Sequence, residues 1–453
     1  MSDSQWVRRG AWALALGYVW WLLRWSVRPE HYFFADDWDW LYRAALFPWK
    51  GQFSLLPQYV PNDRPMGALV FRALYRAFGL NPVPFHWFCV LLHLTNVTLV
   101  AALGQRLMRS WWPAAAAALA YGTWSAAIEP ATWMAGIFDL LGCTLILVTA
   151  LAFSSPRWAV RAASVIFFYF ALRTKETAIV LPVLLAVIVM VCYPRREWIA
   201  VGKRTLLPHV VLALVFVAVY VPLIARGQSA WDASNPYRME PTPRVAAQGL
   251  YFYASAMFYG RPWPLGRLIR WGAALALLGA GVVWGSRATS VGLAGFVLFL
   301  APVLFLSHHR QALYLYIPAA FFALALGGAA EAVADRLAAR PAWREPAAVA
   351  ILLVCIVALP HWAHMRHRAD WIVTHTLRAK QDLDAFRAKV AVLRPEARVA
   401  LVGFPEDYHV FQTYGCPALR LLYHVDGVSC AASEDGAGAD VVVRYRREGI
   451  EVR

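Results

Sequence analysis

Charged residues are scarce in this sequence, and acidic residues are the scarcer kind. Asp, Glu, Lys and Arg make up 15% of the 453 residues, with 27 acidic against 43 basic side chains, and hydrophobic residues make up 60%. This composition excludes an ordinary soluble domain and predicts a polytopic membrane protein. The net charge of +16 does not indicate a nucleic-acid partner, because the basic residues are spread over short loops where membrane topology explains them.

Cysteine is also rare, with six residues, and the sequence has no CxxC pair or metal-like Cys/His spacing. Cys416 and Cys430 lie in the polar C-terminal tail, where a disulfide and two free thiols are both compatible with the sequence. The tail contains no nucleotide-binding loop or catalytic triad, and the chain has no internal repeat. The other cysteines fall in apolar segments and are expected to act as small packing residues: Cys89, Cys143, Cys192 and Cys355.

Long apolar segments are what the sequence has in abundance. A helix needs about 20 mostly apolar residues to cross a bilayer, and eleven segments approach this length. A further apolar and aromatic segment, 246–260, is either an interfacial helix or a twelfth span. The eleven predicted spans are 11–28, 84–105, 111–128, 134–153, 158–172, 177–193, 206–225, 268–284, 290–306, 311–330 and 347–363.

The basic residues of the short loops give the orientation of the spans. They precede span one and follow spans two, four, six, eight and ten, so with eleven spans they all fall on one side, which we assign to the cytoplasm. The other side receives loop 29–83, the turn at Lys175-Glu176, loop 226–267 and the tail. We therefore expect a multi-pass protein of a bacterial inner membrane, with a cytoplasmic N-terminus and an extracytoplasmic tail.

Two regions outside the spans have predicted structure of their own. Within loop 29–83, residues 66–80 have the periodicity of an amphipathic interfacial helix. In the tail, residues 364–453, apolar residues at helical spacing up to Leu393 are followed by short strands at 398–403 and 440–445. The sequence thus predicts a transmembrane module, residues 1–363, and a small α/β tail domain.

The densest acidic cluster lies just after the first span. Asp36, Asp37 and Asp39 occur within four residues, flanked by aromatic residues. Beside low-dielectric surroundings a carboxylate can act as a base or an orienting group, whereas the simpler interpretation is a solvated loop. Asp39 is expected to be the solvated member. Two aspartates are too few ligands to demand a divalent metal, and the use of one stays open.

Other ionisable residues are predicted on the same side of the membrane. Arg64 suits phosphate binding or snorkels at the interface. Asp139, about two turns into span four, is a functional residue or a buried packing contact. Lys175 binds a lipid-linked phosphate or belongs to a simple turn. Acidic and basic groups that face one interface would suit transfer from a phosphorylated lipid to an acceptor hydroxyl. The candidate site residues are Asp36, Asp37, Arg64, Glu129, Asp139, Lys175, Glu176, His309, Arg310 and Tyr314.

Over residues 30–330 the chain resembles the GT-C glycosyltransferases, specifically the branch of the protein O-mannosyltransferases and the transmembrane O-mannosyltransferases that carry tetratricopeptide repeats. Five blocks occur in the family's order. They are Phe33-Phe34-Ala35-Asp36-Asp37; Arg64-Pro65-Met66 with Gly79-Leu80-Asn81-Pro82, His86 and Leu92-His93; Glu129 with Asp139-Leu140-Leu141; Thr174-Lys175-Glu176-Thr177; and Leu315-Tyr316-Ile317-Pro318.

The resemblance implies a GT-C-like helical membrane fold and an inverting transfer from a polyprenyl-phosphate monosaccharide to a protein, lipid or glycan hydroxyl. It implies that Asp36 is the base, that Asp37 orients it, and that Arg64, Lys175, His309 and Arg310 hold the phosphate. The chain departs from the family at Ile137, where an arginine is common, in the displaced Arg310, and in the α/β tail that replaces the repeats.

Two other functions compete with a transferase. A transporter or flippase of lipid-linked precursors usually shows repeat symmetry or charges at mid-membrane, and only Asp139 approaches this. A non-catalytic scaffold that displays the tail would be indifferent to Asp36, Lys175 and Arg310 together.

Overall fold

The structure is a computed structural model that describes residues 3–46, 55–56, 63–125, 128–226, 237–257, 264–337, 349, 361–405 and 416–453. Most of the N-terminal three quarters is helical. The helices before residue 195 are α1 (Asp3–Leu23), η1 (Arg24–Ser26), α2 (Asp36–Leu46), α4 (Pro65–Phe78), α5 (Pro82–Leu107), α6 (Trp111–Gly122), α7 (Ile128–Thr132), η3 (Met134–Gly136), α8 (Ile137–Phe153), α9 (Trp158–Leu172), η4 (Glu176–Val180) and α10 (Leu181–Cys192).

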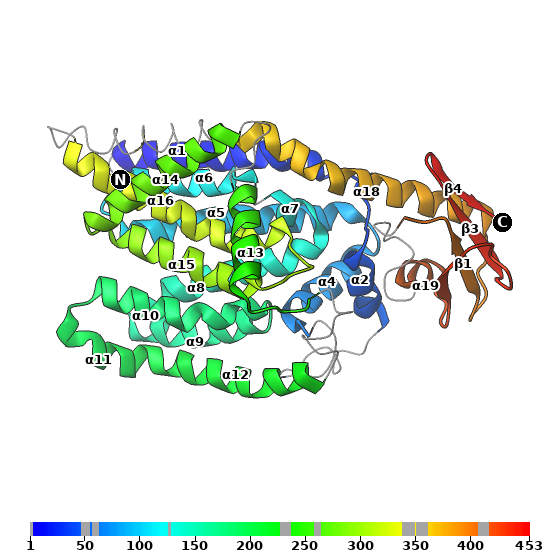
Figure 1. Ribbon diagram of the computed structural model, residues 1–453, viewed down its shortest axis with the longest axis horizontal. Coiled ribbons are helices and arrows are strands. Elements are labelled where there is room, and N and C mark those ends of the chain that lie inside the picture. The colour runs from blue at the N-terminus through cyan, green and yellow to red at the C-terminus, as the bar shows by residue number, and fades with distance from the viewer. Residues whose placement is uncertain are drawn as a thin grey trace.

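The later helices begin with η5 (Arg195–Glu197), α11 (Trp198–Val201), the π-helical η6 (Gly202–Leu206) and α12 (Leu207–Arg226). They continue with α13 (Pro243–Met257), α14 (Pro264–Val283), α15 (Arg287–Leu304), η7 (Ala312–Leu315) and α16 (Tyr316–Leu337). The long helices run side by side, with α12 along one edge of the bundle (Figure 1).

Each predicted span from 11–28 to 311–330 contains a helix, whereas 347–363 lies largely outside the described residues. By length and composition, five described segments could cross a membrane, and three shorter apolar helices accompany them, so the count of eleven stays a prediction. The third span is shorter than predicted, because α6 ends at Gly122. The five long segments are Pro82–Leu107, Met134–Phe153, Arg195–Leu223, Arg287–Leu304 and Ala312–Leu337.

Helix α16 forms the centre of the bundle and is buried along most of its length. It packs against α15 through small residues, since a Cβ on Gly292 would lie 2.5 Å from Ala325 N and one on Gly328 would lie 2.6 Å from Ala288 Cβ. In lipid the hydrophobic effect does not drive helices together, so the van der Waals contacts made by closely packed backbones are a main cause of helix association.

Two helices do not run along the bundle. Helix α13, which contains most of 246–260, crosses the direction of the long helices (Figure 1), an orientation that favours the interfacial interpretation. Helix α4 confirms the predicted helix 66–80. It buries Gly67, Ala68 and Phe71, while Phe78 stays 50% exposed, so the predicted apolar stripe remains available to lipid.

The tail consists of α18 (His361–Lys389), β1 (Arg398–Val402), α19 (Pro417–Tyr423), β2 (Ser429–Ser433), β3 (Val441–Arg446) and β4 (Gly449–Val452). The strands form one sheet in the order β2-β1-β3-β4, parallel at β1–β2 and β1–β3 and antiparallel at β3–β4. The predicted strands at 398–403 and 440–445 are confirmed. Helix α18 extends from the bundle to this sheet and contacts both α7 and β4 (Figure 1).

The structure answers the open question about the tail cysteines. Cys416 and Cys430 form a disulfide that joins the start of α19 to β2 across 14 residues. A cross-link that closes a loop of this length stabilises a fold by about 3 kcal/mol, mainly by restricting the unfolded chain.

We expect the double variant Cys416→Ser/Cys430→Ser to lower the free energy of unfolding of the tail by about 3 kcal/mol. The loss should appear as faster limited proteolysis within 416–453 during urea titration. Cys192→Ser, which removes a free cysteine of α10, is the control. Equal protection of the tail in both variants would contradict this expectation.

Candidate functional site: an acidic loop beside a cation cluster

The acidic residues lie at the start of α2, and Asp37 is the one that is fixed. Its Oδ2 accepts a hydrogen bond from Phe34 N at 3.2 Å, and its Oδ1 accepts one from Ala135 N at 2.7 Å. The side chain is buried, and burial raises the pKa of Asp37 well above its usual range, against the lowering effect of the two backbone donors. Asp37 therefore anchors residues 31–39, which we call the acidic loop, to η3 just before α8.

The other two acids differ from each other in environment. Asp36 is half-buried and lies in the first turn of α2, where the helix dipole favours a negative charge. The prediction that Asp39 is solvated is wrong, because Asp39 is 7% exposed and forms an ion pair with Arg43 at 2.9 Å. Burial raises the pKa of Asp39, and the charge of Arg43 opposes this shift. Of the three acids, Asp36 is the most accessible.

The end of the first outer loop is joined to the turn between α9 and α10. Arg173, 1% exposed, donates to both carboxylate oxygens of Asp63 at 3.1 to 3.2 Å. Met66 N also donates to Arg173 O at 3.3 Å. Because Asp63 and Arg173 are close in sequence to Arg64 and Lys175, these bonds bring the two predicted phosphate-binding residues together.

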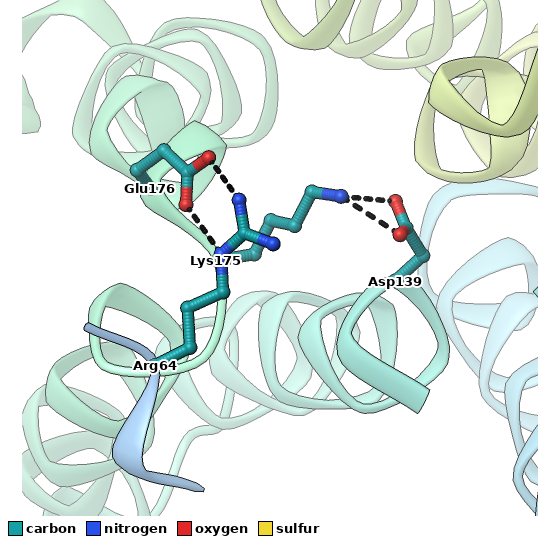
Figure 2. Close-up of polar contacts among 4 residues, drawn as sticks. All are labelled: Arg64, Asp139, Lys175 and Glu176. Atoms are coloured by element: carbon teal, nitrogen blue, oxygen red, sulfur yellow. Dashed lines mark hydrogen bonds and ion pairs between the residues drawn. The ribbon is translucent and has the colours of Figure 1, made fainter. Parts of the chain in front are cut away.

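Arg64 and Lys175 each have a carboxylate partner (Figure 2). Arg64 binds Glu176 through Nε at 3.1 Å and through Nη2 at 2.6 Å. Lys175 Nζ lies 2.7 Å from both carboxylate oxygens of Asp139. Asp139 lies in the first turn of α8, so it is closer to the end of the helix than predicted. Three basic side chains, each paired with a carboxylate, therefore form one group with no net charge. We call it the cation cluster after its basic members, and it consists of Asp63, Arg64, Asp139, Arg173, Lys175 and Glu176.

The acidic loop and the cation cluster meet at the start of α8. Asp37 binds Ala135 and Lys175 binds Asp139, and four helical residues span only about 6 Å along an axis. The Phe138 ring contacts both α2 and the cation cluster, because its centroid lies 4.3 Å from that of Trp40 on α2 and 5.7 Å from Arg64 Cζ. The start of α2, which carries the predicted base, and the two predicted phosphate ligands Arg64 and Lys175 thus both pack near the start of α8.

A cavity of about 430 Å³ opens beside the cation cluster. Its polar end contains members of the cluster and the ring of Tyr314, whose centroid is 5.4 Å from Lys175 Nζ. Its other walls are apolar and come from α12, from 237–239 and from α15. The lining residues are Asp63, Arg64, Lys175, Glu176, Thr177, Ile179, Phe216, Val217, Tyr220, Val221, Tyr237, Met239, Pro302, Val303, Leu306 and Tyr314.

The remaining predicted residues are not all at this cavity. His309 and Arg310 lie before η7 and α16, outside both helices. The His309 ring lies tilted against that of Tyr237 at the cavity wall, with the ring centroids 4.3 Å apart. Burial, with the charge of Lys175 as the lesser cause, lowers the pKa of His309. Arg310 binds Gln248 at 3.2 Å and lines a separate groove with α13. Glu129 is buried in α7.

Two histidines that belong to the family-like blocks have structural partners. His93 binds Tyr316 OH at 2.8 Å and Gly122 O at 3.1 Å, and Asn96 also binds Tyr316 OH. These bonds join α5, α6 and α16 inside the bundle. His86 binds His31 O at 2.9 Å and so connects α5 to the acidic loop.

No group of three or more His, Cys, Asp or Glu side chains in the described residues is arranged to hold a metal ion. Four further residues at this site were not predicted from the sequence: Asp63, Arg173, Tyr220 and Tyr237. The first two were detectable only as neighbours of Arg64 and Lys175, since no local pattern marks an ion pair between residues 110 positions apart.

No family model and no curated protein matches this sequence. Among solved structures, the chain is similar to ArnT from Cupriavidus metallidurans bound to undecaprenyl phosphate, with a TM-score of 0.52 and 18% identity over 95% of this chain and 86% of that chain. It also matches an oligosaccharyltransferase from Archaeoglobus fulgidus in complex with zinc and sulfate, with a TM-score of 0.46 and 11% identity over 91% and 62% of the two chains. The likeness to ArnT confirms the predicted GT-C-like helical membrane fold with a small C-terminal sheet.

Proposed function

We propose that this chain is an integral-membrane glycosyltransferase. It moves a monosaccharide from a polyprenyl-phosphate donor to a hydroxyl group of a protein, lipid or glycan acceptor outside the cytoplasm. The observation that carries the proposal is a cavity lined partly by a charged group that includes Arg64 and Lys175 and otherwise mainly by apolar side chains, because a lipid phosphate also joins a charged group to an apolar chain. The fold shared with ArnT supports it.

The cation cluster suits the phosphate. The bonds from Arg64 to Glu176 use two of the five guanidinium donors, and those from Lys175 to Asp139 use two of three ammonium donors. The remaining donors can bind a phosphate oxygen while the carboxylates stay in place. Basic groups held in this way stabilise the negative charge that develops on the departing phosphate.

The apolar walls suit the lipid chain. Phe216, Val217 and Val221 come from α12, and Pro302 and Val303 come from α15. Helix α12 is largely exposed, with Leu214 62% and Val221 54% accessible. A polyprenyl chain would therefore enter between α12 and α15 directly from the bilayer.

Asp36 suits the role of the base. The acceptor oxygen attacks the anomeric carbon, Asp36 takes the hydroxyl proton, and the bond from this carbon to the phosphate oxygen breaks with its electron pair leaving on the polyprenyl phosphate. Attack on the face opposite the phosphate inverts the anomeric centre. Asp37, held by Phe34 and Ala135, keeps its neighbour at the start of α2.

The donor half of the reaction can be tested before the acceptor is known. The full chain in nanodiscs should release undecaprenyl phosphate from at least one of a panel of undecaprenyl-phosphate monosaccharides, with water or an added polysaccharide as acceptor. In proteoliposomes it should not speed the flipping of a labelled undecaprenyl phosphate. Flipping without release from any donor would overturn the proposal in favour of a transporter.

Gly142 offers a milder test of the cation cluster. A Cβ at Gly142 would lie 3.2 Å from Lys175 Cβ, so we expect the larger leucine side chain to push Lys175 out of its present position beside Asp139. We expect Gly142→Leu to weaken binding of undecaprenyl phosphate about tenfold, because overpacking costs about 1 to 3 kcal/mol. Gly279→Leu, on the open face of α14 with nothing within 4 Å, is the matched control. Equal affinities in the two variants would contradict this role of Gly142.

A further inference from the structure

Helix α18 of the tail packs directly on the acidic loop. The Phe34 ring, 1% exposed, lies 5.8 Å from the Trp371 ring and 6.0 Å from the His375 ring, both on α18. Phe34 also lies 5.6 Å from Trp133, which in turn lies 6.1 Å from Trp371. The residue two positions before Asp36 is thus held in an aromatic group to which the tail contributes two members.

The backbone that this group holds is the one that presents the acidic pair. Phe34 N donates to Asp37 Oδ2, and Asp37 N donates to Phe34 O at 3.1 Å. Ala35 has φ 50°, a left-handed conformation that costs a residue with a Cβ about 1 to 3 kcal/mol and persists only where the surroundings enforce it. Packing on Phe34 is the adjacent interaction that can enforce it.

The tail also contacts the loop on both sides of Asp36. Lys380 Nζ of α18 lies 5.5 Å from the ring centroid of Tyr32, and Arg420 Cζ of α19 lies 5.9 Å from that of Tyr42. Helix α19 as a whole packs against α2. The tail therefore does more than extend from the bundle, because it forms part of the support of the acidic loop.

We propose that Trp371 and His375 are positioning residues for Asp36, and that the tail thereby sets the rate of the transfer step. The inference rests on the proposed function for the role of Asp36, but the docking of α18 on the loop does not depend on it. Trp371 is 40% exposed, so its replacement should leave the bundle folded. The aromatic contacts should be lost while the cavity and the cation cluster stay unchanged.

The test compares Trp371→Ala with the conservative Trp371→Phe and with Thr374→Ala, an exposed position on the same helix. Hydrogen exchange at the amides of Asp37 and Trp38, which bond to Phe34 O and Ala35 O, reports on the loop. Trp371→Ala should speed this exchange and lower kcat for donor cleavage, each by about tenfold, with KM for the donor unchanged. Trp371→Phe should restore most of both, and Thr374→Ala should match the wild type.

Unchanged exchange in Trp371→Ala would overturn the inference even if the chain proves to be a transferase. Faster exchange with kcat unchanged would overturn the link to the transfer step. If the wild type cleaves no donor, the proposed function fails, and the exchange data alone decide whether α18 holds the loop. A rise in KM with kcat unchanged would place the effect of Trp371 at the donor cavity and contradict the proposal.

Discussion

Replacing Asp36 with asparagine should lower the rate of sugar transfer by about 10²- to 10⁴-fold, the usual contribution of a positioned base. The amide keeps the size of the side chain and cannot take the acceptor proton. Binding of undecaprenyl phosphate should be unchanged, because Asp36 is not among the residues that line the cavity beside the cation cluster. The rate is measured as product formation from the donor that the panel identifies.

Glu30→Gln is the matched control, since Glu30 is an exposed acid of the same outer loop. It should keep the wild-type rate and expression. Wild-type activity in Asp36→Asn would remove the base from the mechanism. A loss of activity in both variants would show that the measured effect comes from the charge of the loop in general.

Replacing Lys175 with methionine should affect both stability and binding. Asp139 is 4% exposed, and removing one partner of a buried ion pair leaves an uncompensated charge that costs about 3 to 5 kcal/mol. Affinity for undecaprenyl phosphate should fall about 10- to 100-fold, because a hydrogen bond to a charged group contributes about 1.5 to 3 kcal/mol. Thermal unfolding in detergent and lipid binding in nanodiscs measure the two effects.

The double variant Lys175→Met/Asp139→Leu separates the two effects. Apolar residues of similar volume often replace a buried ion pair without loss of stability, so the double variant should regain most of the thermal stability. It should not regain affinity for the lipid phosphate. Recovery of both would show that Lys175 acts only on the fold and would leave Arg64 as the phosphate ligand.

Local patterns in the sequence predicted much of the fold. Runs of apolar residues predicted most of the helices, and short segments rich in valine predicted β1 and β3. Strand β2 was missed because Ser429–Ser433 contains no strongly strand-forming apolar residue and is mostly exposed. Strand β4 was missed because it is four residues long and half-buried. Both depend on pairing with a neighbour, which a local pattern does not encode.

The site was predicted less completely than the fold. Lys175 and Glu176 suggest a pair within one turn, yet each binds a more distant residue, 36 and 112 positions away. Their partners depend on how α8, α9 and the outer loop pack, which no spacing reveals. Arg310 was expected beside Lys175, but the segment before η7 directs it to the groove at α13.

The central claim is that a lipid phosphate binds beside Arg64 and Lys175, within reach of Asp36. An experimental density map of the full chain in nanodiscs with undecaprenyl phosphate tests it most directly. The account predicts phosphate oxygens within hydrogen-bond distance of Arg64 and Lys175, with the prenyl chain between α12 and α15. A phosphate bound at the Arg310 groove, or at the opposite membrane surface from Asp36, would contradict it.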